Sequence, residues 1–276
     1  MDTIDLLWRK EVPQVRRGRP PRYTTDQIVT TAIGVADEKG ADFTVRDVAA
    51  AVGIPVMSLY SYVDGREQLI VLMADQAYAD MAYTDFTSIG PAGDWRTMLS
   101  AVVADNLALF AEHPWLAEIP VTYAVAGPGA LAKYDRELTA VEPLPFSDTA
   151  KNAVLTLVLD VARTRSRTAA APVAAYEHAA HLPEKLAELN VTERFPLASR
   201  MAAGGAAPLP GADFGYEFGL DLILTGIATM NAAITDRYGP AGGRGNRGRL
   251  TLRTPKSSCP GPGHTGQFTA DAAPDG

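Results

Sequence analysis

The sequence predicts an all-α protein with a small N-terminal helical domain followed by a larger helical domain. Apolar residues recur at helical spacing from about residue 24 to about residue 238, and proline or glycine separates most of the segments. We find no alternation of apolar and polar residues of the kind that a half-buried strand requires, and no internal repeat. A chain of 276 residues has room for two domains, each with its own core.

The overall composition is that of a soluble globular protein. Hydrophobic residues make up 47% of the chain, yet no apolar run reaches the length of a transmembrane helix. The acidic first residues are not followed by the apolar stretch and cleavage site that a signal peptide has. Cys259 is the only cysteine, which rules out an internal disulfide and fits a reducing compartment. We therefore expect a cytoplasmic protein with no membrane partner.

Formal charge is distributed unevenly along the chain, although its sum is −7. Residues 9–22 carry six basic side chains and one acidic, whereas residues 71–240 carry 11 basic and 20 acidic, a net charge of −9. Positive charge is thus gathered near the N-terminus, and phosphate binding needs only such a local patch. We predict that residues 1–22 form a flexible basic arm that contacts DNA through Arg16, Arg17 and Arg19, the alternative being a solvated charged tail.

The first predicted domain spans residues 23–70 and begins with a helix. Thr24 and Gln27 have the spacing of a capping box, in which each residue satisfies the backbone amide of the other. Apolar residues behind this cap fall on one helical face, and the helix should end near Gly40.

Two short helices follow and form a helix-turn-helix. The first spans Thr44–Val52 and ends at Gly53, and the second spans Pro55–Val63. The second helix of such a unit lies in the major groove of DNA. Leu59 and Val63 should face inward, so that the other side chains of this helix point toward thymine methyls, sugars and phosphates. Those candidates are Val56, Met57, Ser58, Tyr60, Ser61 and Tyr62.

A larger domain is predicted over residues 71–238, and residues 239–276 differ from it in composition. The final segment is rich in glycine, proline and arginine and holds almost no large apolar residues. It cannot bury enough surface to offset the entropy of ordering, so we expect it to be disordered. The longer helices that we expect are Arg66–Tyr83, Asp94–Ala111, Pro128–Val141, Ser147–Thr168 and Phe214–Tyr238.

Residues 43–69 carry the most specific pattern in the chain. They read FTVRDVAAAVGI from Phe43, SLYSYV from Ser58 and REQL from Arg66. This run resembles the DNA-binding domain of the TetR family, in which a T-x-x-x-V/L-A-x-x-x-G-V/I helix precedes a recognition helix with T/S-L-Y-x-H/Y-F/V. The resemblance covers roughly residues 20–70, and several positions match in order.

The resemblance implies DNA contacts for individual residues. Arg46 would contact a base or a phosphate, the two tyrosines of the recognition helix and Arg66 would contact phosphates, and the other residues of that helix would lie near bases. Val56 and Met57 depart from the pattern because neither offers a bidentate donor, so base reading leans on Arg46. Asp64-Gly65 departs as well, because the family often has polar or basic residues there. The full set assigned to DNA, together with Arg16, Arg17 and Arg19 of the arm, is Thr44, Arg46, Pro55, Val56, Met57, Ser58, Tyr60, Ser61, Tyr62 and Arg66.

The larger domain resembles the ligand-sensing half of the tetracycline-repressor type in its pattern. Asp94-Trp95-Arg96 opens a long helix that ends near His113-Pro114-Trp115-Leu116. The resemblance implies a helical bundle around an effector pocket and a homodimer through Ser147–Thr168 and Phe214–Tyr238. Interior aromatic side chains could line an apolar pocket, with plain core packing as the alternative. Our candidates for ligand contact are Trp95, Leu99, Phe110, Trp115, Tyr123 and Tyr134, the two tyrosines serving as polar anchors.

Two features point to rival functions, and we rank both below DNA binding. Residues 127–132 fit G-x-G-x-x-A, which binds dinucleotides when it lies between a strand and a helix, so a helical enzyme or adaptor with a nucleotide site at Gly127–Gly129 is the alternative. His178 and His181 could form one face of a metal site, but a solvated helix face is the commoner explanation. We predict a repressor that a small apolar effector releases from a palindromic DNA operator, with no metal, no cofactor and no enzymatic activity.

Overall fold

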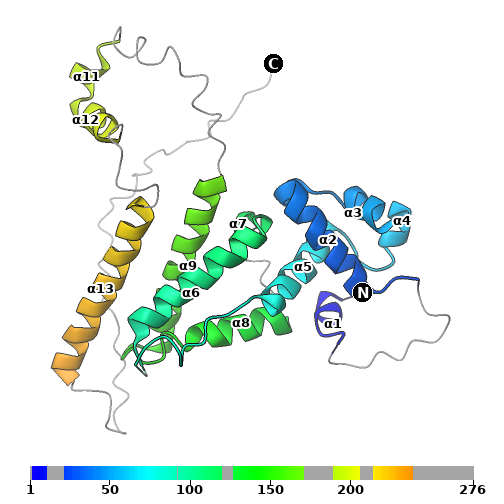
Figure 1. Ribbon diagram of the computed structural model, residues 1–276, viewed down its shortest axis with the longest axis horizontal. Helices are drawn as coiled ribbons and strands as arrows, with labels where there is room; N and C mark the ends of the chain where they lie inside the picture. The colour runs from blue at the N-terminus through cyan, green and yellow to red at the C-terminus, as the bar shows by residue number, and fades with distance from the viewer. Residues whose placement is uncertain are drawn as a thin grey trace, which may run out of the picture. The chain divides into compact units, whose positions relative to one another are not determined.

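Every regular element in the described part of the chain is a helix (Figure 1), in agreement with the predicted fold class. The computed structural model describes residues 2–10, 22–91, 93–119, 127–170, 189–205 and 214–238. Several predictions therefore lie outside the described residues: the DNA contacts Arg16, Arg17 and Arg19, the ligand contact Tyr123, and the tail 239–276.

The helices form two groups along the chain, joined through α5. We call α2 to α4 and the first half of α5 the head, and α6 to α13 the body. The N-terminal elements are α1 (Thr3–Leu7), α2 (Thr25–Lys39), the 3-10 helix η1 (Gly40–Asp42), α3 (Val45–Val52), α4 (Val56–Leu59) and α5 (Arg66–Asp80). The body contains α6 (Trp95–Glu112), α7 (Trp115–Glu118), α8 (Pro128–Leu138), α9 (Asp148–Ala170), α11 (Val191–Arg194), α12 (Pro196–Gly205) and α13 (Phe214–Tyr238).

Capping boxes fix the starts of α2 and α3. The Gln27 amide donates to the Thr24 hydroxyl at 3.1 Å, and the Thr24 amide donates to the Gln27 side chain at 2.8 Å, which confirms the predicted box. Thr44 and Asp47 form a second box at α3. Gly53 ends α3 with a φ of 76°, a left-handed conformation in which the following amides return to the carbonyls of the last turn.

The prediction of a flexible arm over residues 1–22 is wrong for residues 2–10. Residues 3–7 form α1, and Leu6 and Leu7 are buried where α1 packs against α5. Arg9 forms an ion pair of 2.5 Å with Asp26 of α2. Partial burial raises the pKa of Asp26, but the hydrogen bond and charge of Arg9 outweigh it and hold that pKa below its usual value. Five residues are too few for a periodic pattern, so the sequence did not reveal this helix.

The recognition helix is also shorter than predicted. α4 ends at Leu59, whereas the sequence pattern suggested a helix to Val63. The Ser61 amide and hydroxyl both donate to the Ser58 carbonyl, at 3.2 and 2.7 Å, and the Tyr62 amide donates to the Leu59 carbonyl at 2.9 Å. These bonds span three residues, so the chain continues as a tight turn after the α-helix ends.

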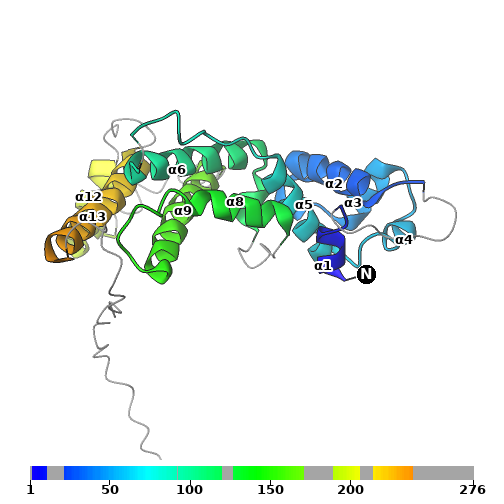
Figure 2. The same ribbon diagram turned by 90° about the horizontal axis from the view of Figure 1, so that it is seen from below.

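α5 is buried on nearly all of its faces. Every residue from Leu69 to Asp75 is buried, because α1 and α2 cover one side of the helix and α8 covers another (Figure 2). A helix that is apolar all round lies inside a protein and does not line its surface. α5 therefore belongs to the core of the head and to the core of the body at once.

α8 approaches α5 so closely that only glycine fits at two positions. A Cβ atom on Gly127 would overlap the Asp75 carboxylate, and one on Gly129 would overlap the Asp75 backbone carbonyl. The Asp75 carboxylate accepts a hydrogen bond of 2.8 Å from the Ala130 amide and so caps the N-terminus of α8 from a different helix. Burial raises the pKa of Asp75, and the amide donors of α8 oppose that shift.

α9 is the central helix of the body. Its residues Leu155, Val158 and Ala162 are buried where it packs against α6, and α13 packs against α9 with Leu224 and Ile227 buried. The predicted segments Ser147–Thr168 and Phe214–Tyr238 thus coincide closely with α9 and α13, which contact each other within one chain.

We predict that Asp75→Ala lowers the free energy of unfolding by about 1–2 kcal/mol, as the loss of an N-cap acceptor does. Asp75→Asn keeps an oxygen for the Ala130 amide and removes the buried charge, so it should be at least as stable as wild type near neutral pH. Urea denaturation of the three proteins measures the difference.

The pH dependence provides the control for this prediction. The folded-state pKa of Asp75 lies above its unfolded value, so the folded protein binds the proton more tightly and gains stability as pH falls through that pKa. The advantage of Asp75→Asn should therefore shrink between about pH 7 and about pH 4. An Asn variant as unstable as the Ala variant at every pH would contradict the capping role.

Candidate nucleic-acid interface

The helix-turn-helix presents one face to its own core and the other to solvent. Leu59 and Val63 are buried together with Val48 and Ala49 of α3, as predicted. On the opposite side Met57 is 79% exposed. Tyr60, Ser58, Ser61 and Arg46 are exposed as well, so all five are accessible to DNA. The structure therefore confirms their outward orientation, while their contacts with DNA stay a prediction.

The other predicted DNA contacts lie nearer to the core. Val56 and Tyr62 are half-buried and pack against the core of the head. Pro55 is exposed at the start of α4. The Thr44 hydroxyl donates to the Asp47 carboxylate at 2.6 Å and also accepts the Asp47 amide, so it holds the first turn of α3.

Asp47 is a residue of this surface that the sequence reasoning missed. Its carboxylate accepts a hydrogen bond of 2.5 Å from Lys39 and two bonds from Thr44. The Lys39 bond, followed by the Thr44 bonds, holds the pKa of Asp47 well below its usual range. The carboxylate thus stays ionised and fixes the turn of chain that carries Arg46. The Thr-x-x-Asp spacing is the signal that could have revealed it.

Arg66 has a structural role inside the head. Its guanidinium donates to the carbonyl of Phe43 at 3.0 Å and to the carbonyl of Ala41, and it lies 4.9 Å from the centre of the Phe43 ring. These bonds connect the start of α5 with the segment before α3. The resemblance implied that Arg66 contacts phosphate, and the structure directs its donors into the protein instead.

Most of the predicted ligand contacts are packed in the core of the body. Leu99, Phe110 and Trp115 are buried, so they serve packing and do not line an open pocket. Trp95 is half-buried against the same core. Tyr134 is 41% exposed and donates its hydroxyl to Asn152 at 2.8 Å on the surface of the body. The structure thus shows core packing for Leu99, Phe110 and Trp115, while contact with a ligand stays a prediction.

A polar bridge joins the head to the body beside α5. Asp37 of α2 accepts a hydrogen bond of 2.8 Å from the Trp115 indole, and it lies 2.8 Å from His113 Nδ1. From the body side, the Arg163 guanidinium of α9 donates to the carbonyls of Leu116 and Ile119 at 2.9 and 3.0 Å. α7 is therefore held by α9 at one end and by the head at the other.

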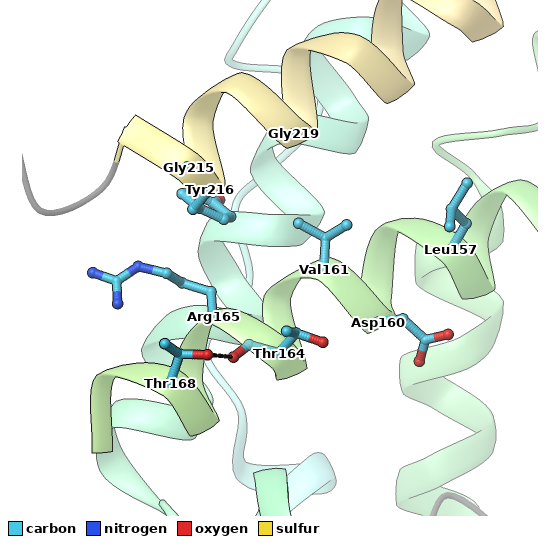
Figure 3. A pocket seen from close by; sticks show the side chains of 9 residues that line it. All are labelled: Leu157, Asp160, Val161, Thr164, Arg165, Thr168, Gly215, Tyr216 and Gly219. Atoms are coloured by element: carbon cyan, nitrogen blue, oxygen red, sulfur yellow. Dashed lines mark hydrogen bonds between the residues drawn. The ribbon is translucent and has the colours of Figure 1, made fainter. Parts of the chain in front are cut away.

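A hollow of about 580 Å³ lies between α9 and α13 (Figure 3). Val161, Leu157 and Tyr216 form its apolar walls, and Gly215 and Gly219 leave space where side chains of α13 would otherwise project. The polar part of the lining consists of Asp160, Thr164, Arg165 and Thr168. The aromatic candidates that the structure describes do not line this hollow.

An apolar ridge continues from the hollow along α13. Phe218, Leu222 and Met230 follow one another at multiples of four residues and are exposed, as is Leu157 on α9. Within the described ranges, α13 between Gly215 and Asp236 is the one helix long and apolar enough to cross a membrane. This helix departs from the expectation that no apolar run reaches that length, and its other face packs on α9 through Leu224 and Ile227.

The rival sites find no support in the described residues. The amides at the start of α8 are where a phosphate would bind in a nucleotide site, but the Asp75 carboxylate occupies that position and would repel an anion. The Gly127–Gly129 turn is therefore a close contact between the start of α8 and α5. His178 and His181 lie outside the described ranges, and within those ranges no cluster of metal-ligating side chains occurs.

Comparison with known families decides the assignment. Residues 90–231 match the C-terminal domain of tetracyclin repressor-like proteins. The chain belongs to the tetracycline-repressor family. Its members are transcriptional regulators, so this chain is a DNA-binding regulator with a helix-turn-helix head and a helical body, as the sequence predicted.

Individual members of the tetracycline-repressor family resemble the chain over most of its length. The HTH-type transcriptional repressor DrrR1 of Streptomyces coeruleorubidus is 29% identical over 247 residues, which cover 83% of this chain and 86% of that protein. The structure of ActR from Streptomyces coelicolor with (S)-DNPA matches with 22% identity and a TM-score of 0.62, over 76% of this chain and 100% of ActR. ActR with actinorhodin matches with 19% identity and a TM-score of 0.59, over 76% and 99%. Because both identities are below 25%, the ActR structures show that this chain has the same fold and nothing further.

We predict that Arg66→Ala lowers the free energy of unfolding by about 1–3 kcal/mol, because charged hydrogen bonds to two carbonyls are lost. Arg46→Ala should change it by less than about 0.5 kcal/mol, because Arg46 is exposed. Urea denaturation measures both. Equal stability of the two variants would show that Arg66 does not hold the head together.

Proposed function

We propose that the chain is a cytoplasmic repressor that binds a palindromic operator as a homodimer and is released when a small molecule binds the body. The observation that carries the proposal is the helix-turn-helix, whose inner face is buried and whose outer face is exposed. The chain that contains it belongs to the tetracycline-repressor family. The similarity to the repressor DrrR1 supports a repressing role.

Base recognition rests on few polar groups. Val56 and Met57 offer no hydrogen-bond donors, so they suit thymine methyl groups. Arg46 at the second position of α3 carries the one guanidinium among the exposed residues of the described helix-turn-helix that can bond to a guanine edge or a phosphate. Tyr60 is also exposed, and its ring and hydroxyl suit the sugar-phosphate backbone.

The ridge on α13 suits a second copy of the chain. A long apolar helix face that is left exposed in one chain is covered in a two-fold interface by the same face of the other chain. The hollow adjoins this ridge, and we assign it to the same interface, where side chains of the second copy fill the space that Gly215 and Gly219 leave open. Two heads held at a fixed spacing then require two half-sites about one helical turn or somewhat more apart.

We predict that duplexes selected by the full-length protein from a random pool are palindromic. Raising the salt concentration from about 50 to about 200 mM should weaken binding at least about 10²-fold, because several phosphate contacts are lost together. Arg46→Ala should weaken binding to the selected site by about 1–3 kcal/mol. Fluorescence anisotropy measures both effects.

Leu222→Glu tests the dimer interface. Leu222 is 56% exposed on the ridge, so a charge there should leave the fold intact, whereas its neighbour Leu224 is buried against α9. The variant should give a folded monomer in light scattering that binds single half-sites weakly. Selection of non-palindromic sequences, or a wild-type protein that is monomeric at micromolar concentration, would argue against this assembly.

The effector is expected to bind the body. ActR, a relative with the same fold, has been solved in complex with actinorhodin and with (S)-DNPA. An effector releases DNA only if it binds the non-binding arrangement of the heads more tightly than the binding one. A tenfold loss of DNA affinity requires about 1.4 kcal/mol of such preference, which lies within the usual range of coupling between sites.

We predict that an effector of the body, with actinorhodin as the first probe, raises the melting temperature and lowers operator affinity at least about tenfold. Thermal shift and anisotropy measured on the same samples test both effects. If compounds from a wider panel stabilise the fold but never change DNA affinity, the body does not sense an effector and serves only dimerisation.

A further inference from the structure

Three polar side chains from two helices meet inside the core of the body. Glu137 of α8 accepts a hydrogen bond of 2.5 Å from Lys133 one turn earlier and one of 2.6 Å from Asn106 of α6. Glu137 is 3% exposed, Asn106 2% and Lys133 8%. We call these three residues the latch.

A buried ion pair such as the latch is weak evidence of a stabilising role. Removing two charges from water costs more than their attraction commonly returns, and apolar side chains of similar volume stabilise a core equally well or better. A buried pair does, however, restrict the arrangement of its helices, because a displaced partner would leave a charge without a counter-ion. The Asn106 amide also donates to the Val102 carbonyl of its own helix at 2.8 Å, so its position on α6 is fixed.

The latch also touches the helix that carries the head. The Lys133 ammonium lies 5.4 Å from the centre of the Tyr78 ring of α5. Asp75, one turn before Tyr78, caps the start of α8 at Ala130. α5 and α8 are thus connected at two points one turn apart on each helix, and together these points define the angle between the helices.

We propose that Lys133, Glu137 and Asn106 act as positioning residues that fix α8 on α6 and thereby set the orientation of α5 and the head relative to the body. Loss of the latch loosens this orientation while the fold persists. The inference extends the proposed function, since the orientation of each head decides whether the two heads match an operator.

Spin labels that report the orientation of the head test this directly. Cysteines replace Ala51 of α3 and Thr149 of α9, both exposed, in a Cys259→Ser background, and the labelled chain is diluted into unlabelled protein. The latch variant is Lys133→Met with Glu137→Leu. The matched control is Lys151→Met with Glu142→Leu, which removes a pair of the same residue types with an N–O distance of 2.8 Å, in which the Glu142 side chain is 77% exposed.

The wild type and the control should give one narrow distance distribution, and the latch variant a distribution at least twice as broad at an equal or higher melting temperature. Its operator affinity should fall at least fivefold, and that of the control should not. A folded latch variant with the wild-type distance distribution overturns the proposal.

A conservative variant decides the question if the double variant loses its cooperative melting transition. Glu137→Gln keeps the shape and an acceptor for Asn106 but removes the charge that holds Lys133, so the same broadening is expected. A wild-type distribution in that variant overturns the proposal. If the wild type itself binds no operator, the proposed function fails, and the distance measurement still tests the latch.

Discussion

The burial of α5 is the constraint on which the rest of the structure depends. This one helix contributes Leu69 and Leu72 to the core of the head and Tyr78 to the core of the body. A helix shared by two cores cannot move in one without disturbing its contacts in the other. The head is therefore an extension of the body, and events in the body can change where the recognition surface points.

Polar groups determine how much this connection can move. Asp75 fixes the start of α8 on α5, and on the opposite side Asp37 receives the Trp115 indole from α7. These contacts are hydrogen bonds between specific atoms, and hydrogen bonds weaken steeply when their distance or angle changes. A displacement of α7 or α8 would therefore break them. Apolar contacts tolerate small sliding, whereas these bonds favour discrete positions. A ligand that displaces this connection must bind the displaced arrangement more tightly than the one with these bonds.

Local signals in the sequence predicted the parts of the fold that are determined locally. The Thr24 box, the glycine end of α3 and the inward Leu59 each follow from a few neighbouring residues. The sequence did not reveal α1 because its helix exists only by packing on α5. Lys133 and Glu137, four residues apart, have the spacing of an ordinary exposed ion pair, and only the three-dimensional arrangement shows that they are buried. The same holds for Trp115, whose burial only the three-dimensional arrangement shows.

The chemistry of the recognition surface explains why the orientation of the head matters so much. A single guanidinium, that of Arg46, supplies directional hydrogen bonding on the described face, and one bidentate pair discriminates between bases by only about 1–3 kcal/mol. Apolar contacts from Met57 add less discrimination, because every thymine offers the same methyl group. In the proposed dimer, a regulator with so few polar contacts per head would gain most of its specificity by requiring two copies of the site at one separation. The separation would be set by α5 and by the residues that hold it, so part of the sequence information that such a dimer reads would be encoded in the buried contacts of its body.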